Sequence, residues 1–167
     1  MASLARQIQS PNTCGHDLSL QNPMVQQAYA GLIAYEPLYH AACLTSPGSA
    51  AADAGTYCFA AAVTNASAPS SSYIYYLPLG VGLPANARLA CTPCLQNTMA
   101  VFAAAAGNSS QPLNGDYAAA ARQIDDTCGS TFVEATVRTT SAAVAGGGWS
   151  LLIAMLSVFL AIVSVVW

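Results

Sequence analysis

The chain has 167 residues, only 7% of them charged, and a formal net charge of −3. Its cations are four arginines that stand far apart in the sequence, so no basic cluster could neutralise the phosphates of a nucleic acid. The length is that of one domain able to bury a core, and the small net charge indicates no particular partner.

The N-terminal quarter of the chain predicts two helices. Residues 2–9 have the pattern of a short helix, which a turn-forming cluster at residues 10–15 ends. Asn22 and Pro23 begin the next helix, because Asn caps helix N-termini and Pro fits the first helical position. Pro37 removes a backbone donor and should kink this helix or split it after Tyr35. Its predicted buried face consists of Val25, Ala28, Leu32, Tyr35, Tyr39 and Ala42.

The middle of the chain is less regular. Residues 46–55 are small and predict a loop, and residues 56–63 fit either a strand or a short helix. Residues 73–77 are β-prone, but Pro78 soon ends the run. We therefore expect an extended segment there that lies over helices.

Two further helices are predicted near the C-terminal end of the domain. Thr92 and Pro93 repeat the cap-then-proline start, and Gly107 ends that helix. Asn114 is the expected cap of the second helix and Gly129 its stop. The short connection predicts an antiparallel hairpin. Its apolar faces are Leu95, Met99, Phe102 and Ala106 on one helix, and Tyr117, Ala120, Ala121, Ile124 and Cys128 on the other.

The last part of the chain predicts a membrane attachment. Residues 149–167 are apolar and uncharged, and as a helix they would be roughly 28 Å long, enough to cross a bilayer core. Residues 138–148 form a stalk of small residues and glycines. A small-residue run, a spacer and an apolar tail make up a glycosylphosphatidylinositol (GPI) signal, and we expect attachment at Ser141. A membrane-spanning tail is the alternative.

The cysteines predict a disulfide framework, because they are even in number and because the GPI-like tail that follows them indicates an extracellular location. The six are Cys14, Cys43, Cys58, Cys91, Cys94 and Cys128. The helical hairpin should bring Cys94 and Cys128 together. Cys43 and Cys58 flank the loop at residues 46–55 and form the second expected pair. Cys14 and Cys91 remain and form the third.

Two sequons, at Asn65 and Asn108, predict N-glycosylation and agree with the secretory pathway. Residues 1–9 contain no apolar leader. Because a GPI signal needs entry to the secretory pathway, we expect that the chain is truncated at its N-terminus.

Other candidate chemistry is weaker. Cys91 and Cys94 have the spacing of a redox dithiol, and with His16 and His40 they could make a zinc site. No βαβ context accompanies them, so structural disulfides are favoured over both.

Glu36 and His40 lie four residues apart and could be an acid–base pair, although a surface pair is the ordinary interpretation. Asp125 and Asp126 point to different sides of a helix and are poor partners in catalysis. The eight tyrosines could include a sugar-binding surface, although most are expected to line the core.

Several sequence blocks together resemble a known family. They are Cys14-Gly15, Asn22-Pro23, Ala34-Tyr-Glu-Pro-Leu-Tyr-His40, Tyr57-Cys-Phe59, Cys91-x-x-Cys-Leu-Gln96 and Gln111-Pro-Leu113. With them the chain resembles, over roughly residues 2–137, a fungal cysteine-rich family known as domain of unknown function 7729. The resemblance implies a secreted or GPI-anchored surface protein and transfers no catalytic residue.

The sequence thus predicts a mainly α, small disulfide-stabilised helical domain with short extended segments, followed by a C-terminal hydrophobic helix. Its parts are an ectodomain at 1–137, a stalk at 138–148 and the tail at 149–167. We expect a cell-surface or cell-wall protein with a structural or interaction role, without cofactor or metal. The alternative is a membrane-tethered polysaccharide-binding module or a secreted enzyme.

Overall fold

The computed structural model describes residues 1–48 and 55–137. The described part is mainly helical, as the sequence predicts, and the stalk, the apolar tail and Ser141 lie outside it. In chain order the elements are α1 (Ala2–Ile8), α2 (Gly15–Ser19), α3 (Pro23–Ala42), α4 (Cys58–Thr64), the 3₁₀ helix η1 (Pro69–Leu79), α5 (Pro93–Ala106) and α6 (Leu113–Cys128).

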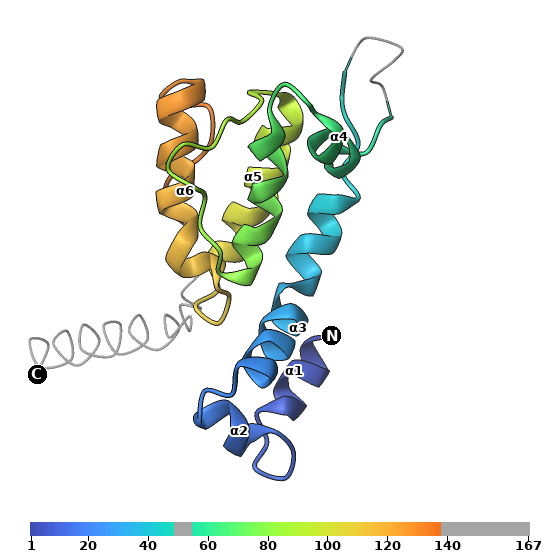
Figure 1. The fold of residues 1–167 in the computed structure, drawn as a ribbon, viewed down its shortest axis with the longest axis vertical. Helices are drawn as coiled ribbons and strands as arrows, with labels where there is room; N and C mark the ends of the chain where they lie inside the picture. The colour runs from blue at the N-terminus through green and yellow to red at the C-terminus, as the bar shows by residue number, and fades with distance from the viewer. Residues whose placement is uncertain (49–54, 138–167) are drawn as a thin grey trace, which may run out of the picture.

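The core lies around the antiparallel pair α5 and α6, which stand side by side in Figure 1. Met99 and Phe102 of α5 and Tyr117 and Ile124 of α6 are fully buried, and Leu77 of η1 is buried in the same cluster. Both predicted apolar faces are therefore confirmed, apart from Cys128, which is only half-buried. The hairpin is confirmed as well, because a short loop leaves the two helices no other way to cover their apolar faces.

The start of α3 is the predicted one, since the Asn22 side chain accepts a hydrogen bond from the backbone N–H of Met24 at 3.1 Å. The helix is not split, and it runs through Pro37 to Ala42. Its predicted buried face is wrong, because Tyr35 and Tyr39 are 47% and 54% exposed.

The buried side of α3 consists of Ala34, Pro37 and Ala41. Tyr35 follows Ala34 by one residue, which places it about 100° further around the helix. The two small alanines allow α3 to approach η1 and α5 closely, so packing selects their side and leaves the larger tyrosines outside.

The middle segment differs from the prediction in one place. The ambiguous stretch is the helix α4, whereas the expected extended segment at residues 73–77 is part of the 3₁₀ helix η1. Within residues 1–48 and 55–137 the one β-pairing is an isolated bridge between Thr45 and Tyr57, so no strand is present to bond an extended chain. A helix bonds its own backbone and buries Ile74 and Leu77 on one side.

After α6 the chain returns along the hairpin and is held there by side chains. Gly129 ends the helix as predicted, with a φ of 115° that favours glycine. Asp125 accepts a hydrogen bond from the backbone N–H of Val133 at 2.9 Å. Tyr117 donates its hydroxyl to the backbone oxygen of Glu134 at 2.6 Å. Residues 129–137 thereby cover one side of the core.

The predicted cap at Asn114 is wrong. α6 begins two residues earlier than predicted, at Leu113, with Pro112 in the cap position. The Asn114 side chain instead donates to the backbone oxygen of Ala106 at 2.8 Å. Because the last carbonyls of a helix lack intrahelical donors, this bond stabilises the end of α5 and not the start of α6.

Candidate functional site

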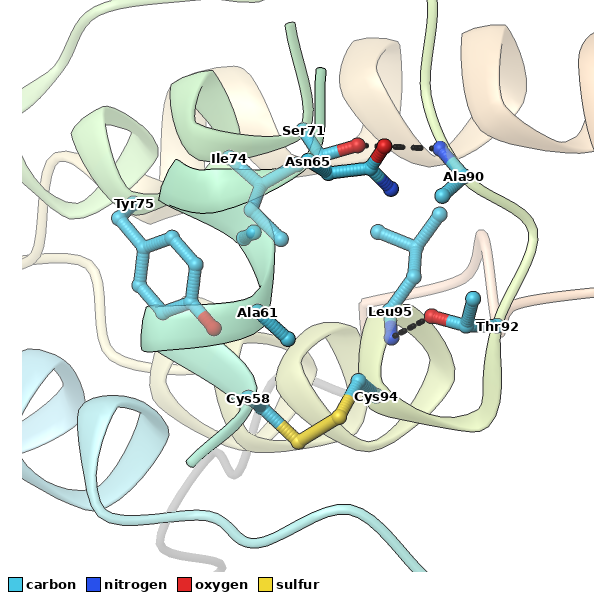
Figure 2. A pocket seen from close by; sticks show the side chains of 11 residues that line it. Cys58, Ala61, Asn65, Ser71, Ile74, Tyr75, Ala90, Thr92, Cys94 and Leu95 are labelled. Atoms are coloured by element: carbon cyan, nitrogen blue, oxygen red, sulfur yellow. Dashed lines mark hydrogen bonds between the residues drawn. A yellow bond between two sulfur atoms is a disulfide. The ribbon is translucent and has the colours of Figure 1, made fainter. Parts of the chain in front are cut away.

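The disulfide between Cys58 and Cys94 connects the first turn of α4 to the first turn of α5, with Cα atoms 5.3 Å apart (Figure 2). The start of α5 has the predicted cap, since the Thr92 side chain accepts from the backbone N–H of Leu95 at 3.3 Å. Cap and disulfide together fix the direction in which α5 leaves the preceding loop.

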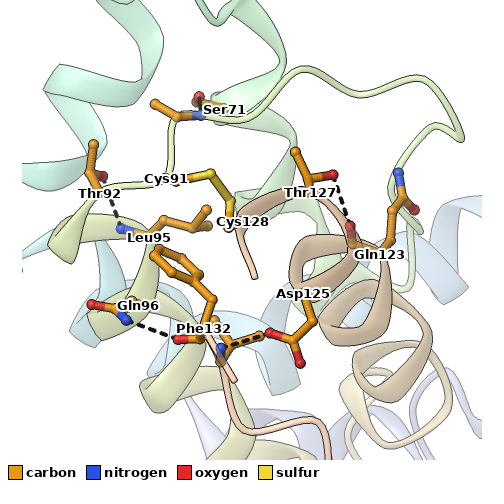
Figure 3. Close-up of a disulfide and its surroundings, with 12 residues drawn as sticks. Ser71, Cys91, Thr92, Leu95, Gln96, Gln123, Asp125, Thr127, Cys128 and Phe132 are labelled. Atoms are coloured by element: carbon orange, nitrogen blue, oxygen red, sulfur yellow. Dashed lines mark hydrogen bonds between the residues drawn. A yellow bond between two sulfur atoms is a disulfide. The ribbon is translucent and has the colours of Figure 1, made fainter. Parts of the chain in front are cut away.

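The second disulfide joins Cys91, just before α5, to Cys128 at the end of α6, with Cα atoms 5.5 Å apart (Figure 3). Nearby, Gln96 of α5 donates to the backbone oxygen of Phe132 at 3.0 Å. The two neighbouring cysteines of the Cys-x-x-Cys block thus bind different helices. One end of the molecule, where α4, α5 and α6 meet, is crosslinked.

All three predicted cysteine pairs are wrong. The hairpin does bring the start of α5 to the end of α6, but Cys94 lies inside the helix and faces α4. Cys91 lies outside the helix, before its cap, and reaches Cys128. Helix geometry alone could not distinguish two cysteines only three residues apart.

Cys14 and Cys43 are free thiols. Cys14 caps α2, which lies near the N-terminal end of α3 in Figure 1, and Cys43 caps the C-terminal end of α3. A helix of 20 residues is about 30 Å long, whereas a disulfide needs Cα atoms within about 7 Å. The two thiols therefore cannot pair with each other in this fold.

The redox and zinc interpretations find no geometry to support them. Cys91 and Cys94 do not bond to each other, and both are oxidised, so neither is a thiolate ligand. His16 belongs to α2 and His40 to α3. Within the part of the chain that the structure describes, no three His, Cys, Asp or Glu side chains gather closely enough to hold a metal ion.

A small cavity lies beside the Cys58–Cys94 disulfide, between α4, η1 and the start of α5 (Figure 2). Its wall includes Ser71, whose hydroxyl oxygen accepts from the backbone N–H of Ala90 at 3.1 Å. The volume of about 60 Å³ would hold about two water molecules. Organic ligands occupy sites of about 300–1,000 Å³, so this cavity is a packing feature.

A much larger groove lies between α1, α3 and the loop that joins α5 to α6. Its volume is about 660 Å³, within the range of ligand-binding sites. A neighbouring hollow between α3 and α5 has about 560 Å³ and shares Glu36, Asn108 and Gln111 with the first. Because they share these walls, the two form one depression along α3, which we name the α3 groove.

Two exposed tyrosines form an aromatic wall of the α3 groove. The rings of Tyr35 and Tyr39, one turn apart on α3, have centroids 6.0 Å apart and planes only 11° from parallel. His40 meets the edge of Tyr39 with a centroid distance of 5.6 Å. Aromatic side chains that are half-exposed in this way can bind a flat apolar surface.

The opposite wall is attached to α3 by one hydrogen bond. In a regular helix the backbone oxygen of Ile33 would accept from the N–H of residue 37, but Pro37 has none. Gln111, in the α5–α6 loop, donates its Nε2 to that oxygen at 2.8 Å. The Oε1 atom of Gln111 is buried and has no hydrogen-bond partner among the described residues. The proline thus creates the acceptor that holds the groove together.

The charged candidates that the sequence singled out lie in two different places. Glu36 and His40 are both exposed, and both line the α3 groove, where no second carboxylate from the described residues joins them. Asp125 binds the backbone of Val133, a structural role that the sequence did not indicate. Of the tyrosines, Tyr75 and Tyr117 are buried in the core. Only part of the predicted aromatic surface is therefore open to a ligand.

Comparison with protein families matches residues 1–137 to the family described as Domain of unknown function (DUF7729). The chain belongs to this family. The DUF7729 domain therefore contains every described helix, both disulfides and the whole α3 groove. Neither the curated proteins nor the solved structures provide a match to the chain.

The two sequons occupy different environments in the DUF7729 domain. Asn65 is half-buried at the end of α4, where its oxygen accepts from the backbone N–H groups of Ser67 and Ala68, both at 3.0 Å. Asn108 is exposed, and its oxygen accepts from Ser110 through the backbone N–H at 3.0 Å and the hydroxyl at 2.8 Å. The Asn108 side chain is the more accessible of the two.

Membrane attachment falls on residues that the structure does not describe. Ser141 and the apolar tail lie outside the described ranges, and among the described helices none has the length and apolar character needed to cross a bilayer.

Sequence reasoning missed Gln111 as a site residue, although part of the signal was present. A proline inside a helix leaves the carbonyl four residues earlier without its donor, so an unpaired acceptor at Ile33 could be anticipated. Its partner is 78 residues away in the chain, and only the packing of α3 against the α5–α6 loop identifies it.

Proposed function

We propose that this protein works at the cell surface or in the cell wall, in a structural or interaction role, and that a GPI anchor at Ser141 holds it there. The observation that carries the proposal is the pair of disulfides that crosslink α4, α5 and α6. Such crosslinks persist in oxidising compartments and are rare in the cytosol. The uncharged apolar tail at 149–167 supports an anchor, and we include N-linked glycans at Asn65 and Asn108 in the proposal.

The role that we propose is binding and not catalysis. The described lining of the α3 groove includes two tyrosine faces, amide side chains, Arg6, His40 and one carboxylate, Glu36. These groups suit recognition by stacking and hydrogen bonding. Glu36 and His40 both belong to α3 and therefore lie on the same wall of the groove, whereas paired-carboxylate hydrolysis needs two carboxylates on opposite sides of the substrate.

The anchor is tested by treating cells that express the full chain with a phosphatidylinositol-specific phospholipase. We expect the protein to move to the soluble fraction, and its C-terminal peptide to lack Leu151. A matched variant, Leu156→Asp, breaks the apolar tail and should leave the protein unanchored before any treatment. Retention in the membrane after treatment, with Leu151 still present, would refute the GPI anchor.

A second candidate function is the binding of polysaccharide, and one specific observation favours it. Tyr35 and Tyr39 present nearly parallel, half-exposed rings on the wall of a groove large enough for a ligand. Aromatic faces beside polar side chains are a common means of holding sugars, because a sugar ring has apolar faces and a polar edge.

A further inference from the structure

We propose that the α3 groove binds a neutral, β-linked oligosaccharide of the glucose configuration, with its sugar rings stacked on Tyr35 and Tyr39. This inference rests on the proposed binding role and names its site and ligand class. It does not depend on how the protein is attached to the membrane.

The aromatic wall determines the configuration of the sugar. A β-linked glucopyranose unit carries its substituents equatorially, so both faces of its ring present C–H groups. These faces match the negative faces of tyrosine rings. The rings of Tyr35 and Tyr39 are stacked on each other, 11° from parallel with centroids 6.0 Å apart, so the ring faces that point away from the stack can hold a sugar unit of the chain. An axial hydroxyl, as in mannose, would disturb one of the two faces.

The polar side chains of the groove fit the hydroxyl edge of such a ligand. Sugar hydroxyls both donate and accept, and the walls contain donors at Arg6 and Gln9 and an acceptor at Glu36. The side-chain charges of Arg6 and Glu36 balance, which favours a neutral ligand over an acidic one. Gln111 is one of three residues that line both hollows, and its buried Oε1 has no hydrogen-bond partner among the described residues.

The shape of the groove favours a chain of several units over a single sugar. The hollow beside α1 has about 660 Å³ and continues into the hollow of about 560 Å³ beside α5. Glu36 lines both of them and stands next to Tyr35 in the sequence. A ligand stacked on the aromatic wall can therefore extend from one hollow into the other.

The molecule contains its own control for the aromatic wall. Tyr73 and Tyr76 on η1 are 45% and 49% exposed, close to the values for Tyr35 and Tyr39. Their ring centroids are 6.3 Å apart, but their planes are tilted by 52°. Neither residue lines the α3 groove. If exposure alone caused sugar binding, both pairs would contribute equally.

The test is titration calorimetry on the full chain in a zwitterionic detergent without a sugar headgroup. The ligands are the hexasaccharides of β-1,3-glucan, β-1,4-glucan and chitin, with an α-mannan hexasaccharide for comparison. We expect binding of at least one β-linked ligand in preference to the mannan. Tyr35→Ala and Tyr39→Ala should each weaken it by about tenfold or more, whereas Tyr73→Ala and Tyr76→Ala should change it by less than about twofold.

Three results would overturn the inference. They are no binding of any β-linked hexasaccharide by protein with both disulfides intact, equal or stronger binding of the mannan, and equal losses from the two tyrosine pairs. The phospholipase experiment distinguishes a failure of the sugar-binding proposal from a failure of the anchor proposal. A protein that is released from the membrane but binds no sugar refutes the ligand and leaves the anchor standing.

Discussion

Tyr117 is fully buried, and its hydroxyl donates to the backbone oxygen of Glu134 in the segment that follows α6. Burial disfavours the charged phenolate, and the carboxylates of Glu134 and Asp125 add repulsion, so the pKa of Tyr117 is raised from 10.0 to about 12. One side chain thus fills the core and holds the returning chain, and it can do both only while it is protonated.

The raised pKa of Tyr117 predicts a loss of stability in alkali. Below pH 10 the phenol is protonated in both the folded protein and the unfolded chain. Between about pH 10 and 12 the unfolded chain loses this proton first, so the free energy of unfolding should fall by up to about 3 kcal/mol. The measurement is denaturant unfolding at several pH values, with the free thiols alkylated. Tyr117→Phe should remove much of this slope, and an unchanged slope would contradict the prediction.

Gly15 and Gly31 should respond to alanine with opposite signs. A Cβ on Gly15 would stand 2.5 Å from the backbone oxygen of Gln9 and 2.7 Å from that of Ser10, so the chain must shift. A Cβ on Gly31, in α3, would meet nothing within 4 Å. We expect Gly15→Ala to cost about 1–3 kcal/mol and Gly31→Ala to gain about 0.5–1 kcal/mol in unfolding free energy. Thermal unfolding of both variants measures this, and equal shifts would be the contrary result.

At the scale of elements, α3 shows how packing overrides a sequence pattern. Its tyrosines and its alanines both recur at helical spacing, so periodicity permits two different faces. Close approach to η1 and α5 favours the side of Ala34 and Ala41, and this places Tyr35 and Tyr39 on the groove. The candidate site is therefore a consequence of which face was buried.

Pro37 and Gln111 should be energetically coupled. Gln111→Leu leaves the half-buried backbone oxygen of Ile33 without its donor and should cost about 1–3 kcal/mol. In a Pro37→Ala background the helix supplies its own N–H to Ile33, so the same change should cost about 1 kcal/mol less. A double-mutant cycle by denaturant unfolding measures the difference. Strict additivity would show that the hydrogen bond contributes nothing.

At the scale of the whole molecule, two crosslinks hold one end and few contacts hold the other. The disulfides close segments of 36 and 37 residues that overlap at Cys91 and Cys94. In Figure 1, α1 and α2 lie against the far half of α3, away from the crosslinked end. We therefore place the stability of the domain mainly in α4, η1, α5 and α6, and its recognition surface along α3.

Removal of one crosslink should destabilise the domain without changing its helices. The Cys91→Ser, Cys128→Ser double variant reopens a segment of 37 residues, which should cost roughly 4 kcal/mol in unfolding free energy. Cys43→Ser, at an exposed free thiol, is the matched control and should change it by less than about 0.5 kcal/mol. Denaturant unfolding followed by circular dichroism gives both values. Equal effects would contradict the assignment.

The pairing itself is read from unreduced tryptic peptides. Cleavage at Arg88 and Arg122 leaves Cys91 and Cys94 in one peptide, and fragmentation before Pro93 then separates them. We expect Cys91 to carry the peptide of Cys128. Cys94 carrying that peptide would restore the pairing that the sequence predicted.

The sequence by itself determined the helical class, the starts of α3 and α5, and the buried faces of the α5–α6 hairpin. These features depend on local chemistry, such as a capping side chain, a proline in the first turn or an apolar repeat. Tertiary structure alone decided the disulfide partners, the exposed side of α3 and the bond from Gln111 to Ile33. Each of these joins groups far apart in the chain, and local pattern contains no information about which distant surface will supply the contact.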